Sequence, residues 1–184
     1  SWAEFQKEKP SSEVVKGWWS QWPDAMIGVV TGKVSNLLAI DTDEDEALHQ
    51  VESFLPENLE IPIATSPGGG KHYHFQYQDG IRSFSQNDNP NIKFHIRSEG
   101  ACIISPPSTR KDGKSYSWVK GLSLNEIPTP PLPDALYKYI TNYLALNKYK
   151  ETTNQKDQLT TTDHKFFKFG RRDEDLFHAA NIMA

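Results

Sequence analysis

Cysteine is almost absent from this chain of 184 residues, which contains only Cys102. A lone cysteine cannot form an intramolecular disulfide, so the disulfide frameworks of small secreted domains are excluded. Cys102 lies in a short apolar segment, and we expect it to be a buried and unreactive residue. The fold must therefore depend on a hydrophobic core, for which a chain of this length is sufficient.

Long apolar runs are missing too. No stretch approaches the roughly 20 apolar residues that a helix needs to cross a bilayer. The first residues also lack the basic, apolar and small-residue segments of a signal peptide. We therefore expect no membrane partner and a cytoplasmic location.

An excess of positive charge, which is usual in nucleic-acid-binding proteins, is missing as well, because the net charge is −4. The charges are nevertheless unevenly distributed. The segment 93–120 has six Lys or Arg and two acidic side chains. Five acids account for more than the whole net charge: Asp41, Asp43, Glu44, Asp45 and Glu46. An acidic metal site beside a basic groove would have this distribution, and so would an ordinary solvated surface.

Asp41 and Asp43 follow residues 37–40, an apolar run typical of a buried strand. Side chains at i and i+2 of a strand share a face, so we expect the two carboxylates to lie together. A bound divalent cation commonly relieves their repulsion. Alternatively, residues 43–46 only enrich the first turn of the next helix in acids, which explains Asp41 poorly.

A run of three glycines leads into the alternating segment 71–77. Glycine allows backbone amides to approach an anion, so Gly69 and Gly70 are candidates for holding phosphate. The alternation predicts a strand with His72 and His74 on one face and aromatic residues on the other. The alternative is a plain turn followed by histidines on a solvated face.

A second alternating segment, residues 92–97, predicts a strand with apolar residues toward a core and Lys93, His95 and Arg97 on the other side. These side chains offer two fixed cations and one imidazole that can titrate or bind a metal. A charged outer face is equally ordinary for a half-exposed strand. Residues 101–105 form another apolar segment, and we expect it to pair with 92–97 as a hairpin.

Helices are predicted on both sides of these strands. Residues 12–22 have helical spacing, with Ser12 as the expected N-cap and the tryptophans expected in the core. Another helix is expected to follow the acids, and a third to begin at Asp134. Residues 148–165 are polar and lack periodicity, which is typical of a linker.

Taken in order, these segments resemble the primase-polymerase (prim-pol) domains of the archaeo-eukaryotic primase superfamily, found in plasmid, phage and mobile-element replication proteins. The resemblance covers about residues 1 to 120, and its specificity comes from the ordered set of motifs. The motifs are Trp18-Trp19-Ser-Gln-Trp22-Pro, Ile27-Gly28-Val-Val-Thr31-Gly32, Ala39-Ile40-Asp41-Thr-Asp43, Thr65-Ser-Pro-Gly-Gly-Gly70-Lys-His72-Tyr-His-Phe75, Gly80-Ile-Arg82-Ser83, Ile96-Arg97-Ser-Glu-Gly100-Ala-Cys-Ile-Ile-Ser-Pro106-Pro107-Ser108 and Asp112-Gly113-Lys-Ser-Tyr116-Ser-Trp118.

The resemblance implies an α+β fold: a primase (RRM-like) catalytic core with a mainly antiparallel sheet flanked by helices, plus a small N-terminal α/β unit. It assigns residues 1–147 to the catalytic domain, 148–165 to the linker and 166–184 to the start of a helical C-terminal primase region. Relatives carry a further strand before the first tryptophan, and we expect this chain to lack it. A helical or helicase region is the expected C-terminal partner.

The implied activity is that of a DNA primase and DNA polymerase, a template-dependent nucleotidyltransferase that makes and extends primers on single-stranded DNA from NTP or dNTP. Asp41 and Asp43 would hold Mg²⁺ or Mn²⁺ for two-metal phosphoryl transfer, and His72 would contact the nucleotide phosphates. Such a protein would associate with the nucleoid or a replicon. The remaining nucleotide-binding candidates are Gly69, Gly70, Arg82, Lys93 and Arg97.

His95 departs from the family pattern, because relatives have an acidic residue in this third motif. If His95 binds the metal together with Asp41 and Asp43, the imidazole shifts the preference from magnesium toward manganese. If it does not, the metal site is weakened. The sequence leaves both outcomes open, and we favour Mn²⁺.

Two other functions remain open at this point. His72 and His74 could form the metal pair of an HUH-type rolling-circle or relaxase nuclease, with Tyr137 or Tyr143 as the nucleophile. That chemistry would leave the two aspartates without a role. A catalytically inactive, nucleic-acid-binding prim-pol relative is the other alternative, and the third-motif histidine makes it plausible.

Overall fold

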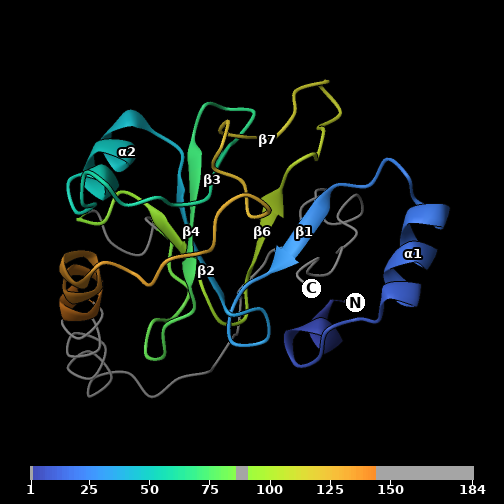
Figure 1. Cartoon of the computed structure of the whole chain (residues 1–184), viewed down its shortest axis with the longest axis horizontal. Helices are drawn as coiled ribbons and strands as arrows, with labels where there is room; N and C mark the ends of the chain where they lie inside the picture. Colours follow the sequence, from blue (N-terminus) through green and yellow to red (C-terminus); the bar gives the residue numbers. More distant parts are fainter. Residues whose placement is uncertain (1, 86–90, 144–184) are drawn as a thin grey trace, which may run out of the picture.

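The structure is a computed structural model, and it describes residues 2–85 and 91–143 (Figure 1). The predicted linker, 148–165, and the predicted start of a C-terminal region, 166–184, lie outside the described residues. None of the helices in the described part of the chain has the length and apolar character of a membrane span.

Short strands make up most of the described elements, and five of them follow α2 in succession. In chain order they are η1 (Ala3–Gln6), α1 (Ser12–Gln21), β1 (Ile27–Val30), β2 (Leu37–Thr42), α2 (Asp45–Glu52), β3 (Ile63–Thr65), β4 (Lys71–Gln76), β5 (His95–Arg97), β6 (Cys102–Ser105) and β7 (Ser117–Trp118). Residues 134–143 form a further helix, which begins at Asp134 as predicted.

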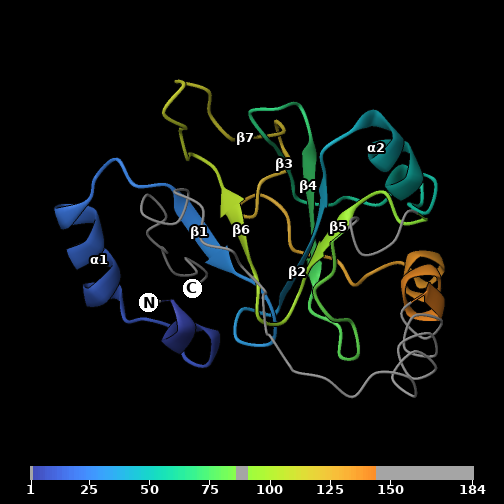
Figure 2. The same ribbon diagram turned by 180° about the vertical axis from the view of Figure 1, so that it is seen from behind.

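The strands form two antiparallel sheets. The larger has the order β5-β2-β4-β3-β7, and the smaller pairs β1 with β6. Figures 1 and 2 show the small sheet between the large sheet and α1, with α2 and the helix 134–143 on the far side. The α+β class and the mainly antiparallel sheet are thus confirmed, whereas the RRM-like arrangement stays a prediction.

The core covers one face of the large sheet. Along β2, Leu38 and Ile40 belong to this core, together with Tyr73 and Phe75 of β4. Both helices contribute apolar side chains: Ala47 and Val51 from α2, and Leu136 and Ile140 from the helix 134–143. Full burial of each large side chain contributes about 2 kcal/mol to stability. The alternate residues of β2, including Asp41, face the opposite side of the sheet.

The predicted hairpin between residues 92–97 and 101–105 is wrong. β5 is shorter than expected and pairs with β2, whereas β6 pairs with β1 in the other sheet. The intervening turn explains the change, because the Thr31 hydroxyl donates to the Ser98 carbonyl at 2.7 Å and draws the chain toward the small sheet. Cys102, expected to be buried, is half-buried at the start of β6.

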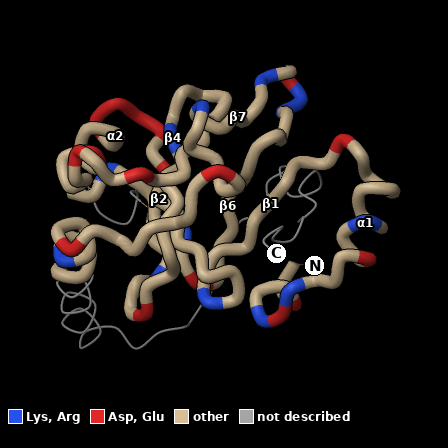
Figure 3. The backbone as a smooth tube through the Cα atoms, in the orientation of Figure 1, with Lys and Arg blue, Asp and Glu red and all other residues tan. Residues whose placement is uncertain are grey.

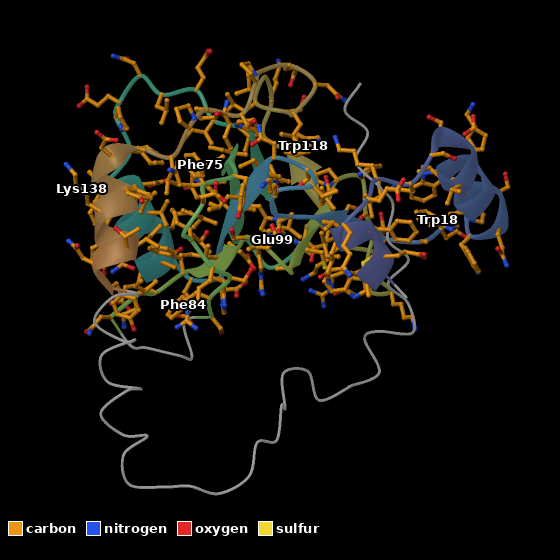
Figure 4. All side chains as sticks on the ribbon, turned by 90° about the horizontal axis from the view of Figure 1, so that it is seen from below. Trp18, Phe75, Phe84, Glu99, Trp118 and Lys138 are labelled. Atoms are coloured by element: carbon orange, nitrogen blue, oxygen red, sulfur yellow. The ribbon has the colours of Figure 1, made fainter. Side chains whose placement is uncertain are left out.

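The N-terminal helix also differs from its prediction. The N-cap is Ser11, not Ser12, and its hydroxyl accepts a hydrogen bond from the Val14 amide at 3.4 Å. The expectation that the tryptophans lie in the core is wrong, because Trp18, Trp19 and Trp22 are only partly buried. Trp18 instead meets Phe5 edge-to-face. Figure 4 shows the reason: α1 lies at the end of the molecule opposite to Lys138, beyond the small sheet.

Candidate functional site

Three predicted site residues meet on the polar face of the large sheet. Asp41, near the end of β2, is directly opposite His72 on β4 and directly opposite His95 on β5. Directly opposed residues of antiparallel strands point to the same face. Sequence alternation correctly assigned each side chain to a face, and the strand pairing brings the three side chains together.

Asp41 is held by an imidazole and a guanidinium. Its Oδ1 lies 3.3 Å from His72 Nε2, and its Oδ2 accepts a hydrogen bond from the Arg97 guanidinium at 3.2 Å. The Asp41 side chain is only 13% exposed. Burial acts to raise the pKa of Asp41, but His72 and Arg97 together outweigh it and hold this pKa below its usual value. Asp41 is therefore a largely buried carboxylate that stays ionised at neutral pH.

Asp43 and His95 form a second carboxylate–imidazole pair. Asp43 lies just beyond β2, and its Oδ2 is 3.2 Å from His95 Nε2. The other ring nitrogen, Nδ1, is 3.2 Å from the Ser85 hydroxyl. Asp43 is 58% exposed, so this pair opens to solvent while Asp41 lies deeper. Nothing in the sequence pattern pointed to Ser85 as the residue that orients His95.

His72 is oriented by the small sheet. Its Nδ1 lies 3.1 Å from the Ile104 carbonyl of β6, and its ring packs beside Tyr116 with the centroids 5.6 Å apart. Carbonyl contacts of this kind leave no signal in a sequence. Tyr116 belongs to a recognised motif, yet the motif alone assigned it no role. Both sheets therefore contribute to the position of this imidazole.

His74 shares the face of His72 but has a structural environment. It is 1% exposed, its Nδ1 lies 3.0 Å from the Pro62 carbonyl, and Trp118 packs against its ring. Burial lowers the pKa of His74 to about 4, so its imidazole is neutral at physiological pH. A neutral and enclosed imidazole supports the fold at this position.

The glycine turn packs tightly against the end of β2. Gly69 has a φ of +95°, and its amide donates to the Ser66 carbonyl at 3.0 Å within the turn. A Cβ on Gly70 would collide with the Thr42 carbonyl oxygen. Thr42 in turn exchanges two hydrogen bonds with the backbone of Lys71. Both glycines thus have a conformational reason for their presence, and their contact with phosphate stays a prediction.

The three predicted basic residues are separated. Arg97 contacts Asp41, as described above. Lys93 instead lies toward α2, where its Nζ is 3.5 Å from Glu46. Arg82 is exposed, and its backbone forms a bridge with Glu99. The structure therefore brings Arg97, and neither Lys93 nor Arg82, into contact with the aspartate–histidine cluster. A nucleotide-binding role for all three stays a prediction.

The cluster offers donor types that suit a divalent cation, and one of its pairs has a suitable spacing. Carboxylate oxygens suit Mg²⁺ and Mn²⁺, and an imidazole is compatible with Mn²⁺. The 3.2 Å between Asp43 Oδ2 and His95 Nε2 resembles the spacing of about 3 Å between adjacent ligands of a small octahedral ion. Among the described residues, no three His, Cys, Asp or Glu side chains form a group that could hold a metal ion.

Fold and site together define an α+β domain with paired carboxylates and imidazoles on the polar face of an antiparallel sheet. Residues 1–135 match the sequence profile of Prim-Pol, described as "Bifunctional DNA primase/polymerase, N-terminal". The chain belongs to this family, and the matched range includes the whole aspartate–histidine cluster. No curated protein matches the chain closely enough to count as a relative.

Proposed function

We propose that this domain is a template-dependent nucleotidyltransferase, a DNA primase and polymerase that uses NTP or dNTP on single-stranded DNA. The observation that carries the proposal is the position of Asp41. In a chain of the Prim-Pol family, this ionised carboxylate lies between His72 and Arg97 and in register with His95. The cluster combines side chains that can ligate a cation with side chains that can donate hydrogen bonds to phosphate oxygens.

Asp41, Asp43 and His95 are the residues that would hold Mg²⁺ or Mn²⁺. A bound divalent cation would stabilise negative charge on the phosphoryl oxygens and activate the attacking hydroxyl. The imidazole of His95 favours Mn²⁺ as the working ion. Ser85 supports this role, because its contact with Nδ1 leaves Nε2 directed toward Asp43.

His72 and Arg97 are the groups proposed to bind the phosphates of the incoming nucleotide. Both contact Asp41, and an anionic phosphate can compete with that carboxylate for the same donors. The Ile104 carbonyl holds the His72 ring, so little reorganisation is needed when phosphate binds. In this proposal Gly69 and Gly70 bring the backbone of their turn close to the bound phosphates. Arg82 and Lys93 would contact the nucleotide from further out.

The fold is consistent with a primase (RRM-like) core, which we include in the proposal. The helices α2 and 134–143 supply core residues to one face of the five-stranded sheet, and the aspartate–histidine cluster lies on the other. Asp43, whose side chain is 58% exposed, is the member of the cluster most accessible to a long polymeric substrate. Single-stranded DNA, a primer and a C-terminal helical or helicase region are the proposed partners.

The HUH-type nuclease is disfavoured by the positions of its required residues. His74 is enclosed against Pro62 and Trp118. Tyr137 and Tyr143 pack with the core on the opposite face of the sheet, where Tyr143 meets Phe84 edge-to-face. Neither tyrosine is therefore on the face that carries the histidines.

One assay distinguishes the candidate functions. The protein is incubated with a single-stranded template, labelled nucleotides and either Mg²⁺ or Mn²⁺, with and without a primer. Nucleotide incorporation that disappears in Asp41→Ala supports the proposal. Strand cleavage with a tyrosine-linked product would support the nuclease, and strand binding without either reaction would identify an inactive relative.

A further inference from the structure

A basic hairpin projects beside the aspartate–histidine cluster. It comprises residues 109–115, which connect the end of β6 to the segment leading into β7, and every one of these residues is exposed. Figures 1 and 2 both show it rising from the edge where β6 ends. The blue segments of Figure 3 mark its cations. Three cations outnumber one acid: Arg110, Lys111 and Lys114 against Asp112.

The hairpin has a defined conformation. The Arg110 amide donates to the Lys114 carbonyl at 2.8 Å, and the Gly113 amide donates to the Arg110 carbonyl at 2.9 Å. Gly113 has the positive φ, +79°, that this turn requires. Asp112 accepts a hydrogen bond from the Lys114 amide at 3.2 Å and forms an ion pair with the Arg110 guanidinium, whose nitrogen is 3.1 Å from Oδ2. The single acid is therefore used to build the turn and to orient Arg110.

The base of the hairpin contacts β1 and β4, and β4 is one of the strands that form the candidate site. The Tyr116 amide donates to the Ser108 carbonyl at 2.8 Å, and the buried Ser108 hydroxyl accepts from the Ile27 amide at 2.7 Å. Tyr116 also packs against His72. One hydrogen bond to β1 and one ring contact to β4 thus fix where the cations emerge relative to the cluster.

We propose that the hairpin 109–115 binds the sugar-phosphate backbone of the nucleic-acid strand that occupies the candidate site. This inference rests on the proposed function for the identity of its ligand. The three cations project from an exposed turn, an arrangement that suits successive phosphates along a strand. A free triphosphate would instead require donors that converge on one pocket. Because the hairpin is already ordered by hydrogen bonds, binding costs little loss of backbone freedom.

The test compares two variants with the same change in net charge. The first is Arg110→Gln/Lys111→Gln/Lys114→Gln. The matched control is Lys7→Gln/Lys9→Gln/Lys16→Gln, which removes three exposed cations near η1 and α1. Binding of a labelled single-stranded oligonucleotide to the 184-residue protein is followed by fluorescence anisotropy over a series of salt concentrations, without nucleotide or metal. Thermal melting checks that both variants fold.

The hairpin variant is expected to bind at least about tenfold more weakly at low salt. Its plot of log affinity against log salt should lose about two units of slope, because each lost phosphate contact removes about 0.7. The control should keep most of the affinity and slope. If the triple variant does not fold, Lys114→Gln alone should lose about a third of that slope change.

Unchanged strand binding in the hairpin variant would overturn the proposal, and so would an equal loss in the control, which would indicate a general effect of net charge. A second arm measures a labelled nucleoside triphosphate, whose affinity should not change. A loss in that arm alone would assign the hairpin to the nucleotide and reject the strand contact. If the wild type binds strands through the hairpin but incorporates nothing, the proposed function fails and the hairpin inference stands. If the wild type incorporates nucleotides but its strand binding does not depend on the hairpin, the proposed function stands and the hairpin inference fails.

Discussion

Asp41 and His72 lie directly opposite each other on β2 and β4, with the carboxylate Oδ1 3.3 Å from the imidazole Nε2. Arg97 engages the other carboxylate oxygen. The three side chains therefore form one connected polar unit on a largely buried surface. Removal of the Asp41 carboxylate would leave the Arg97 guanidinium without its partner, which is costly in such surroundings.

The first prediction concerns Asp41→Asn. The amide keeps the shape of the side chain but can neither neutralise Arg97 nor bind a cation as a carboxylate does. We expect primer extension to fall by at least about 100-fold. Asp24→Asn is the control, because Asp24 is an exposed acid in a turn. Wild-type extension rates in Asp41→Asn, with folding verified by circular dichroism, would contradict a role in the reaction.

The second prediction concerns the metal preference. Wild-type protein should incorporate nucleotides better with Mn²⁺ than with Mg²⁺, because His95 supplies an imidazole ligand. His95→Ala should remove this advantage, which steady-state extension assays in both ions would measure. His49→Ala serves as the control, since His49 is exposed on α2. Equal activity with the two ions, unaltered in His95→Ala, would show that His95 is not a ligand.

The third prediction uses the buried imidazole of His74, whose pKa is about 4 in the folded protein against 6.5 for an ordinary histidine. The unfolded chain therefore takes up this proton first, so stability is complete above about pH 6.5 and falls as the pH is lowered toward 4. We expect a loss of about 2 kcal/mol between about pH 7 and about pH 4.5. Urea unfolding across this range measures it.

The matching variant for that experiment is His74→Gln, which keeps a donor for the Pro62 carbonyl but does not titrate. Its free energy of unfolding should depend less on pH than that of the wild type by a similar amount. The exposed His49→Gln should leave the pH dependence unchanged. A His74→Gln profile parallel to the wild type would show that His74 does not set the pH dependence.

The fourth prediction separates two glycines. Gly70→Ala should destabilise the protein by about 3 kcal/mol, because the new Cβ would meet the Thr42 carbonyl oxygen and the backbone must move. Gly17→Ala should instead stabilise it by up to about 1 kcal/mol, since Gly17 lies in α1 with open space around the added carbon. Chemical denaturation measures both changes. Equal stability of the two variants would refute the close approach at Gly70.

Local alternation was sufficient to predict which side chains share a face. Burial is decided residue by residue along a strand, so Ile92, Phe94 and Ile96 were correctly assigned to the core. The same alternation does not predict the direction of side chains that lie outside the strand. Lys93 was grouped with His95, but β5 begins only at His95, and Lys93 turns toward Glu46 on α2 instead.

The sequence pattern did not predict which distant segments pair as neighbouring strands. Proximity along the chain favoured a hairpin of 92–97 with 101–105, whereas the observed partner of β6 is β1, about 75 residues earlier. That choice depends on hydrogen bonds such as the one from Thr31 to the Ser98 carbonyl, which no local periodicity reveals. The contact between His72 and the Ile104 carbonyl follows from the same pairing and was missed for the same reason.

The alternation along β2 makes a small shift in strand alignment a large error. If β2 slid by one residue against its neighbours, Asp41 would point into the core and Ile40 would point outward. The buried charge and the exposed apolar side chain would both lower the stability of the misaligned fold, so the chain would not populate it. The strand alignment that buries the core is therefore also the alignment that assembles the aspartate–histidine cluster.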